Sequence, residues 1–170
     1  PELMAAFKEV ADIQTADMLK LPVPEAHYHN IALKPSEYQK EIVASLAERA
    51  EKVRNREVDS SVDNMLLITN DGRKLALDQR LVNPMLPSDP NSKAAKCAEN
   101  VFEIWQRTAG QRSTQMIFCD LSTPSDRWNA YGELRGLLVD RGVPDDGIRF
   151  IHDAKNDRDK GRLFAAARSG

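Results

Sequence analysis

The chain has 170 residues, 41% of them hydrophobic, and a formal net charge of -2 at neutral pH. This length suits one domain with its own core, and the nearly balanced charge excludes a globally basic nucleic-acid-binding protein, so contacts with phosphates must come from a local patch. Two cysteines, Cys97 and Cys119, make no metal-type pair and favour a cytoplasmic protein over a disulfide scaffold. No stretch reaches the roughly 20 apolar residues of a membrane span, so no membrane partner is expected.

The first 24 residues predict two short helices and a linker. Thr15 is the expected N-cap of the second helix. Pro22 and Pro24 exclude a helix and predict an extended path after it. We therefore expect a domain boundary near Glu25.

Two histidines follow this boundary. His27 and His29 stand two residues apart, so on a strand they would share one face, as a metal-binding pair requires. Because no third ligand lies nearby in sequence, ordinary edge-strand residues are favoured and no metal site is assigned.

A capping box opens the next predicted helix. Ser36 is placed as N-cap and Gln39 as N3, which is the arrangement that satisfies two backbone donors at a helix start. The apolar stripe of this helix consists of Tyr38, Ile42, Leu46, Ala50 and Val53. The opposite face carries charges of both signs and is interpreted as a solvated surface.

Residues 58–91 predict a helical insertion. Asn70-Asp71-Gly72 is a strong turn pattern, and its apolar flanks fit either strand–turn–strand or helix–turn–helix. Helices are favoured on both sides because Leu, Met, Ala, Lys, Gln and Arg dominate and β-branched residues are few. A proline-rich loop over residues 83–91 follows. The next helix begins after Ser92, with Gly110 as its expected C-cap.

The stretch from Thr114 to Asp153 predicts a strand–helix–strand unit. Apolar runs at residues 116–119 and 148–151 flank a helix that begins near Ser125 and stops at Gly142. Apolar runs joined by a crossover are typical of a parallel sheet covered on both faces. The predicted fold class is therefore α/β.

Polar residues follow the first predicted strand, at the end where open α/β sheets place their ligands. Asp120, Ser122 and Thr123 are the residues concerned, and Asp153 stands at the end of the second strand. Asp120 either orients neighbouring groups or caps the next helix. A further alternative is a small-molecule enzyme that uses Asp120 and Asp153 as paired carboxylates, for which a strongly raised carboxylate pKa in a closed pocket would be diagnostic.

The last 22 residues form the most basic part of the chain. Residues 149–170 hold six basic and three acidic side chains, an excess that suggests phosphate contacts. The sequence contains no G-x-x-x-x-G-K-[ST] loop, G-x-G-x-x-G, G-x-S-x-G or H-E-x-x-H motif. The self-contained catalytic motifs are thus missing.

Taken in order, five segments resemble the second RecA-like lobe of Swi/Snf-type, superfamily-two DNA helicases. The resemblance is closer to the large helicase-and-DNA-methylase proteins carried by bacterial phages, plasmids and integrative elements. It rests on the order and spacing of the segments more than on any one of them. The segments are ADIQTADMLKLPVP, LKPSEYQKEIVASLAERAEKVR, DNMLLITNDGRKLALDQRLVNP, TQMIFCDLSTP and IRFIHDAKNDRDKGRLF.

The resemblance implies a domain organisation. Residues 1–24 would be the end of a preceding helicase lobe and a linker. Residues 25–170 would be an incomplete RecA-like C-terminal lobe, with a partial parallel sheet flanked by helices. The phosphate-binding loop would lie in the lobe upstream and the arginine-finger motif beyond the segment, so ATP and Mg²⁺ are expected for the parent motor and no cofactor in this segment.

The resemblance also implies a DNA-tracking role without hydrolytic residues. Ser122, Thr123, Lys155 and Arg158 would contact the DNA backbone weakly and in a salt-dependent manner. The chain departs from the family pattern at Cys119-Asp120, where Ser-Gln is usual, and at Asp153-Ala154, where Asp-Gly is usual. The alternative interpretation is a non-catalytic α/β module that binds a protein partner through residues 63–90.

Overall fold

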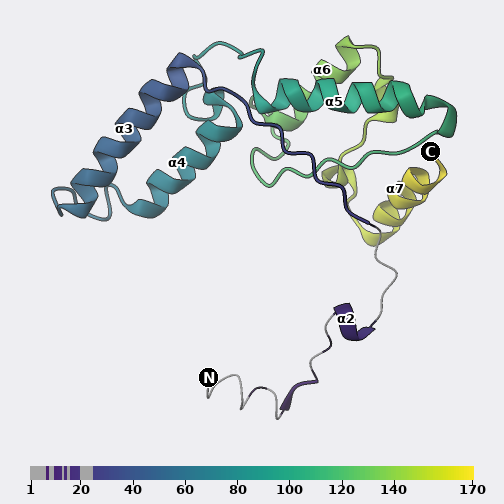
Figure 1. Cartoon of the computed structure of the whole chain (residues 1–170), viewed down its shortest axis with the longest axis horizontal. Helices are drawn as coiled ribbons and strands as arrows, with labels where there is room; N and C mark the ends of the chain where they lie inside the picture. The colour runs from purple at the N-terminus through teal and green to yellow at the C-terminus, as the bar shows by residue number, and fades with distance from the viewer. Residues whose placement is uncertain (1–6, 8–9, 13, 15, 20–24) are drawn as a thin grey trace. The chain divides into compact units, whose positions relative to one another are not determined.

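The fold was determined as a computed structural model that describes residues 7, 10–12, 14, 16–19 and 25–170. The chain divides into two units, Pro1–Ala32 and Leu33–Gly170, each of which is considered by itself (Figure 1). In the first unit, α2 spans Ala16–Leu19, and residues 25–32 have no regular secondary structure. The predicted N-cap Thr15 and the prolines Pro22 and Pro24 lie outside the described residues.

The second unit consists of helices and irregular segments. Its α-helices are α3 (Glu37–Arg54), α4 (Met65–Leu77), α5 (Lys93–Thr108), α6 (Ala130–Asp140) and α7 (Asp157–Ser169). Its 3-10 helices are η1 (Gln79–Leu81), η2 (Ala109–Gln111), η3 (Asp145–Gly147) and η4 (Ile151–Asp153). The described residues contain no β-strand, so the predicted α/β fold with a partial RecA-like parallel sheet is wrong for this part of the chain.

The two segments predicted as strands lack the burial and the pairing that a parallel sheet requires. A strand in a covered parallel sheet is buried on both faces and hydrogen-bonded to neighbours along its edges. Met116 and Phe118 are instead 74% and 88% exposed, and residues 113–120 form no ladder. The second apolar run turns into η4 at Ile151. Both runs are short, and a short apolar run does not by itself distinguish a strand from an irregular segment that packs on one side.

Helices α3 and α4 pack against each other (Figure 1). The predicted capping box is confirmed, because Ser36 Oγ accepts from the Gln39 amide at 3.1 Å while the Gln39 side chain accepts from the Ser36 amide at 2.9 Å. The predicted turn at Asn70-Asp71-Gly72 is wrong, since α4 runs through it without a break. A Cβ on Gly72 would lie 3.8 Å from Leu46 Cδ1, so this glycine lies at the contact between the two helices.

Arg49 of α3 binds both the loop between these helices and the middle of α4. Its guanidinium makes two hydrogen bonds to the Asp63 carboxylate, at 2.7 and 2.9 Å, and a third to Asp71 at 2.9 Å. A bidentate pair of this kind fixes both partners. The hydrogen bonds from Arg49 lower the pKa of the Asp63 carboxyl below its usual value. Asp71, which was predicted to lie in a turn, therefore connects α4 to α3 through Arg49.

Helices α5 and α6 enclose the apolar core. Its centre is formed by Ala98, Leu138 and Val143. Partly buried residues surround this centre: Val101, Phe102, Trp105, Leu134, Leu137 and Ile148. The core therefore lies in the second half of the unit.

The boundaries of these two helices were predicted in part. Ser92 is the N-cap of α5, as expected, whereas the helix ends at Thr108, so Gly110 is not its C-cap. Helix α6 begins at Ala130 with Asn129 as N-cap, later than the predicted start near Ser125. Gly142 adopts a left-handed φ of 100°, which confirms it as the stop after α6.

A buried polar cluster joins the α3–α4 pair to α6, and we call it the Arg80 network: Asp78, Arg80, Trp128 and Glu133. The Asp78 side chain is 1% exposed and accepts from Arg80 Nε and Nη2 at 2.9 and 2.8 Å. The same Nη2 donates to Glu133 Oε1 at 3.0 Å. The Arg80 guanidinium lies 4.1 Å above the Trp128 ring, whose Nε1 donates to Glu133 Oε2 at 3.1 Å. Arg80 of η1 thereby contacts Glu133 on α6 and Trp128 just before this helix.

The neighbouring Gln79 extends these contacts to the start of α3. Its Nε2 donates to the Pro87 carbonyl at 2.8 Å, and its Oε1 accepts from Ser36 Oγ at 2.6 Å. Gln39 then donates to the Leu75 carbonyl at 2.9 Å. Each of these buried polar groups thus has a partner, as a low-dielectric interior requires.

We predict that replacing Arg80 by Ala destabilises the chain by about 3 kcal/mol or more, because it leaves the Asp78 carboxylate buried without its cation. Urea denaturation measures the free energy of unfolding. The matched control is Arg73→Ala, which removes an exposed ion pair with Asp120 and is expected to cost less than about 1 kcal/mol. Equal losses in the two variants would show that the network does not stabilise the fold.

We further predict that stability falls as the pH drops through the acidic range. The pKa of Asp63 is lowered in the folded chain, so the unfolded chain binds the proton first and protonation favours unfolding. Denaturation curves from about pH 6 to about pH 2 should show a smaller loss in Asp63→Asn than in the unsubstituted chain. Asp126→Asn, at an exposed carboxylate, is the control and should leave the pH dependence unchanged. Identical curves for all three proteins would contradict the prediction.

Candidate nucleic-acid interface

Tyr131, in the first turn of α6, contacts both of the segments that were predicted to be strand ends, at Cys119 and at residues 150–152. Its hydroxyl donates to the Cys119 carbonyl at 2.6 Å. Its ring meets Phe150 and His152 edge-on, with centroid distances of 5.4 and 5.1 Å. Burial, with smaller contributions from the nearby Cys119 and Asp120, raises the pKa of Tyr131, so its phenol remains a hydrogen-bond donor at neutral pH. The predicted proximity of the two segments is therefore achieved through one tyrosine, without a sheet.

Ser122 and Thr123 differ in their availability for a ligand. Ser122 has a left-handed φ of 57°, and its Oγ accepts from the Ala130 amide at 2.8 Å, where it satisfies a free donor at the start of α6. Thr123 is exposed. Of this predicted pair, Thr123 presents its hydroxyl to solvent and Ser122 serves first as a helix cap.

The two predicted carboxylates are both on the surface. Asp120 forms an ion pair with Arg73 of α4, and both side chains are largely exposed. Asp153 lies in η4 and is also exposed. The pKa of Arg135 is raised chiefly by the hydrogen bonds that it donates to Asp145, and the charge of Asp153 adds a smaller contribution. An ion pair that is so exposed to water adds little stability. The arrangement fits an orienting role for Asp120 and lacks the closed pocket that a carboxylate-based enzyme needs.

Lys155 and Arg158 stand at the start of α7, on either side of its N-cap Asn156. Both are exposed and, within the described part of the chain, neither forms an ion pair. Among the described residues, no hydrogen bond or ion pair joins Lys155 or Arg158 to Ser122 or Thr123.

Helix α7 has an inner and an outer side. The inner side carries Asp159, Leu163 and Ala167, which are partly buried, and the Ala167 carbonyl accepts from Thr114 Oγ1 at 2.6 Å. The outer side carries the exposed Arg158, Arg162 and Arg168. Gly161 and Ala165 lie between these arginines. We call this surface, together with Lys155, the α7 basic face.

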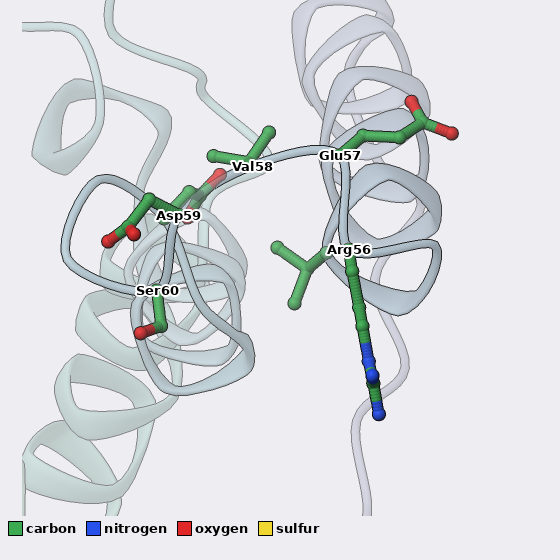
Figure 2. A pocket seen from close by; sticks show the side chains of 7 residues that line it. Arg56, Glu57, Val58, Asp59 and Ser60 are labelled. Carbon is green, nitrogen blue, oxygen red and sulfur yellow. The ribbon is translucent and has the colours of Figure 1, made fainter.

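A hollow of about 450 Å³ lies beside the end of α3, in the loop that leads to α4 (Figure 2). Arg56 and Asp59 line it, and Figure 2 shows their side chains pointing in different directions. Asp59 accepts hydrogen bonds from Ser61, chiefly through the Ser61 hydroxyl, and these lower its pKa. The hollow has one cationic side chain, Arg56, which points in a different direction from Asp59, and its carboxylates already accept hydrogen bonds from other residues. It therefore does not fit a nucleotide-phosphate site.

Other site types have little support in the described part of the chain. His27 and His29 are exposed there, and no group of three His, Cys, Asp or Glu side chains in it is arranged to hold a metal ion. Burial, and to a lesser degree Cys119, raises the pKa of the Cys97 thiol, which disfavours its reactive thiolate form. Nor does any helix among the described residues have the length and apolar character needed to span a membrane.

Comparison with known proteins gives no relatives. We find no family model that matches the sequence, and no match among the curated proteins or the solved structures.

Sequence reasoning missed two features of this region. It gave Tyr131 no role as a hydrogen-bond donor, although a buried tyrosine hydroxyl usually has a hydrogen-bond partner. It also gave no role to Asp78 and Arg80. The sequence shows Asp78 and Arg80 two residues apart at the end of a helix. It does not show that the pair is buried, because that burial depends on Glu133 and Trp128, which are remote in the sequence.

Proposed function

We propose that this chain binds the phosphate backbone of DNA through the α7 basic face, as the DNA-contacting part of an ATP-dependent helicase or translocase. The observation that carries the proposal is the exposure of Lys155, Arg158 and Arg168, none of which forms an ion pair among the described residues. Exposed cations without partners can release the counterions of a phosphate chain on contact. The helicase context comes from the resemblance of residues 148–164 and the other four segments to DNA motors.

The spacing on α7 suits a phosphate chain. Arg158 and Arg168 are ten residues apart, which corresponds to about 15 Å along a helix, a length over which one DNA strand presents roughly four phosphates. Gly161 and Ala165 between them have short side chains and allow close approach of the backbone. Thr123 would add a hydroxyl contact and Ser122 a weaker one. Such contacts position a duplex without reading its bases.

This mode of binding sets expectations for the whole motor. Affinity should be weak, insensitive to base sequence and strongly dependent on salt. ATP and Mg²⁺ would be bound by other parts of the parent protein, together with the preceding helicase lobe. This chain would then hold the DNA, while closure and opening of the motor would move it along the DNA.

A second candidate is a protein-interaction module, which an exposed apolar group favours. Val62 and Leu66, at the start of α4, are 72% and 78% exposed, and Met65 beside them is about half exposed. Apolar side chains gathered at one helix start are a common feature of protein-binding surfaces. Binding at this surface would be insensitive to salt, which distinguishes it from the α7 basic face.

We predict that Arg158→Ala combined with Arg168→Ala weakens DNA binding by roughly tenfold or more at low salt and flattens its salt dependence by about two units of slope. Fluorescence anisotropy with a labelled duplex, measured over a salt series, gives both quantities. Lys52→Ala combined with Arg107→Ala is the matched control, since it removes the same charge from exposed positions on α3 and α5. Both variants should remain folded, as checked by circular dichroism.

Two results would contradict the proposal. One is the absence of DNA binding by the unsubstituted chain at low salt, which would leave the interaction surface around Leu66 as the better account. The other is an equal loss of affinity in the control, which would show that the total charge matters and the α7 basic face does not.

A further inference from the structure

Residues 113–120, which leave the end of α5, have an alternating pattern of exposure. Gln115 and Cys119 are partly buried, and Gln115 Nε2 donates to the Val101 carbonyl on α5 at 2.9 Å. Ile117 between them is 42% exposed, whereas Met116 and Phe118 are 74% and 88% exposed. A period of two is that of an extended chain. In the middle of the segment, Gln115 and Cys119 therefore turn toward the body of the protein, whereas Met116 and Phe118 turn away from it.

The two backbone edges of this segment also differ. In an extended chain, the amide and carbonyl groups of alternate residues point to opposite edges. The carbonyl of Cys119 is bound by the Tyr131 hydroxyl, so the edge of the odd-numbered residues faces the protein's own α6. Within the described residues, the backbone groups of residues 113–118 have no hydrogen-bond partner, so the two edges differ in the one bond at the Cys119 carbonyl. The edge of the even-numbered residues is thus open for strand pairing.

The charges at the two ends of the segment are self-complementary. If a second copy pairs antiparallel with Met116 opposite Met116, Arg112 of one copy lies opposite Asp120 of the other, and the same pair forms again at the other end. In this register Thr114, Met116 and Phe118 form the hydrogen-bonded pairs, which is the register that the open edge requires. Charge complementarity and edge availability therefore select the same alignment.

We propose that the chain forms a symmetric dimer by antiparallel pairing of residues 113–120 of two copies, centred on Met116. On the outward face, the two Met116 and two Phe118 side chains form an apolar cluster, with Phe118 diagonal to the partner's Met116. An Arg112–Asp120 pair closes each end. The interface is isologous, so no further copies add to it.

The existing contacts of the two charged residues are compatible with this pairing. Asp120 binds Arg73, and Arg112 donates to the Gly170 carbonyl. A carboxylate accepts several hydrogen bonds and a guanidinium has five N–H donors, so each has capacity for a second partner. Both side chains are exposed. The dimer shields these charges from water only partly, and the apolar cluster at the centre supplies most of the driving force.

Two charge-reversal variants test the register. Arg112→Asp places like charges opposite each other at both ends, and Asp120→Arg does the same with positive charges, so each variant alone should dimerise roughly tenfold or more weakly. Aspartate is well tolerated at position 112, where the backbone is left-handed with a φ of 52°. When the two variants are mixed, opposite charges meet at both ends of a mixed dimer, and dimerisation should return. Sedimentation equilibrium measures all three cases, with Lys52→Ala, at an exposed position on α3, as the control that should leave dimerisation unchanged.

Cross-linking provides an independent test that leaves the charges unaltered. In a background of Cys97→Ala and Cys119→Ala, Met116→Cys should oxidise to a disulfide-linked dimer, because paired residues on the symmetry axis have Cα atoms about 5.5 Å apart. Phe118→Cys is the matched control. Its two copies would be separated by about four residues along the strands, or about 13 Å, and should not cross-link.

The proposal is overturned if the unsubstituted chain sediments as a monomer over the whole concentration range. It is equally overturned if the folded charge variants fail to dimerise when mixed, or if Phe118→Cys cross-links as readily as Met116→Cys. Restoration of dimerisation in the mixture together with cross-linking at position 116 alone supports it. DNA binding by the α7 basic face does not enter these measurements, so failure here leaves the proposed function untouched.

Discussion

The fold of Leu33–Gly170 depends on a buried carboxylate at the end of α4. Asp78 is removed from water, so its charge requires the two hydrogen bonds from Arg80, and Arg80 in turn binds Glu133 and lies over Trp128. A buried charge pair adds little stability compared with an apolar replacement, but it strongly penalises arrangements that separate the partners. The Arg80 network thus specifies how the α3–α4 pair meets α6, while the apolar core stays within α5, α6 and the segments after them.

This division of roles explains where functional surfaces can occur. The network and Gln79 satisfy the polar groups at the junction, and the core is built mainly from α5 and α6. Helix α7 contributes a partly buried inner side and leaves its arginines to solvent. Residues 113–120 bind the rest of the unit through the side chains of Thr114, Gln115 and Asp120 and the carbonyl of Cys119, and they leave Met116 and Phe118 to solvent. The parts of the unit least needed for the core are therefore the ones that present charge and open backbone.

Features that depend on near neighbours were predicted well, and those that depend on remote partners were not. Three helix ends depend only on residues a few positions away in the chain, so the sequence predicted them correctly at Ser36, Ser92 and Gly142. A sheet needs a partner strand, and the apolar run at residues 116–119 carries no information about one. The turn pattern at Asn70-Asp71-Gly72 was overridden because Arg49 and Leu46 hold α4 straight from a different helix. For the candidate site, Lys155 and Arg158 were recognisable as exposed cations, whereas the capping role of Ser122 depends on the tertiary position of Ala130.

Native-state hydrogen exchange of α3 and α6 tests the central claim most directly. If the Arg80 network unites the two halves, the most protected amides of both helices exchange only on global unfolding and give opening free energies that agree within about 1 kcal/mol. If α3 and α4 instead exchange through a lower-energy opening while α5 and α6 remain protected, the halves unfold separately. That result would contradict the account, since the network would then join two structures that do not depend on it.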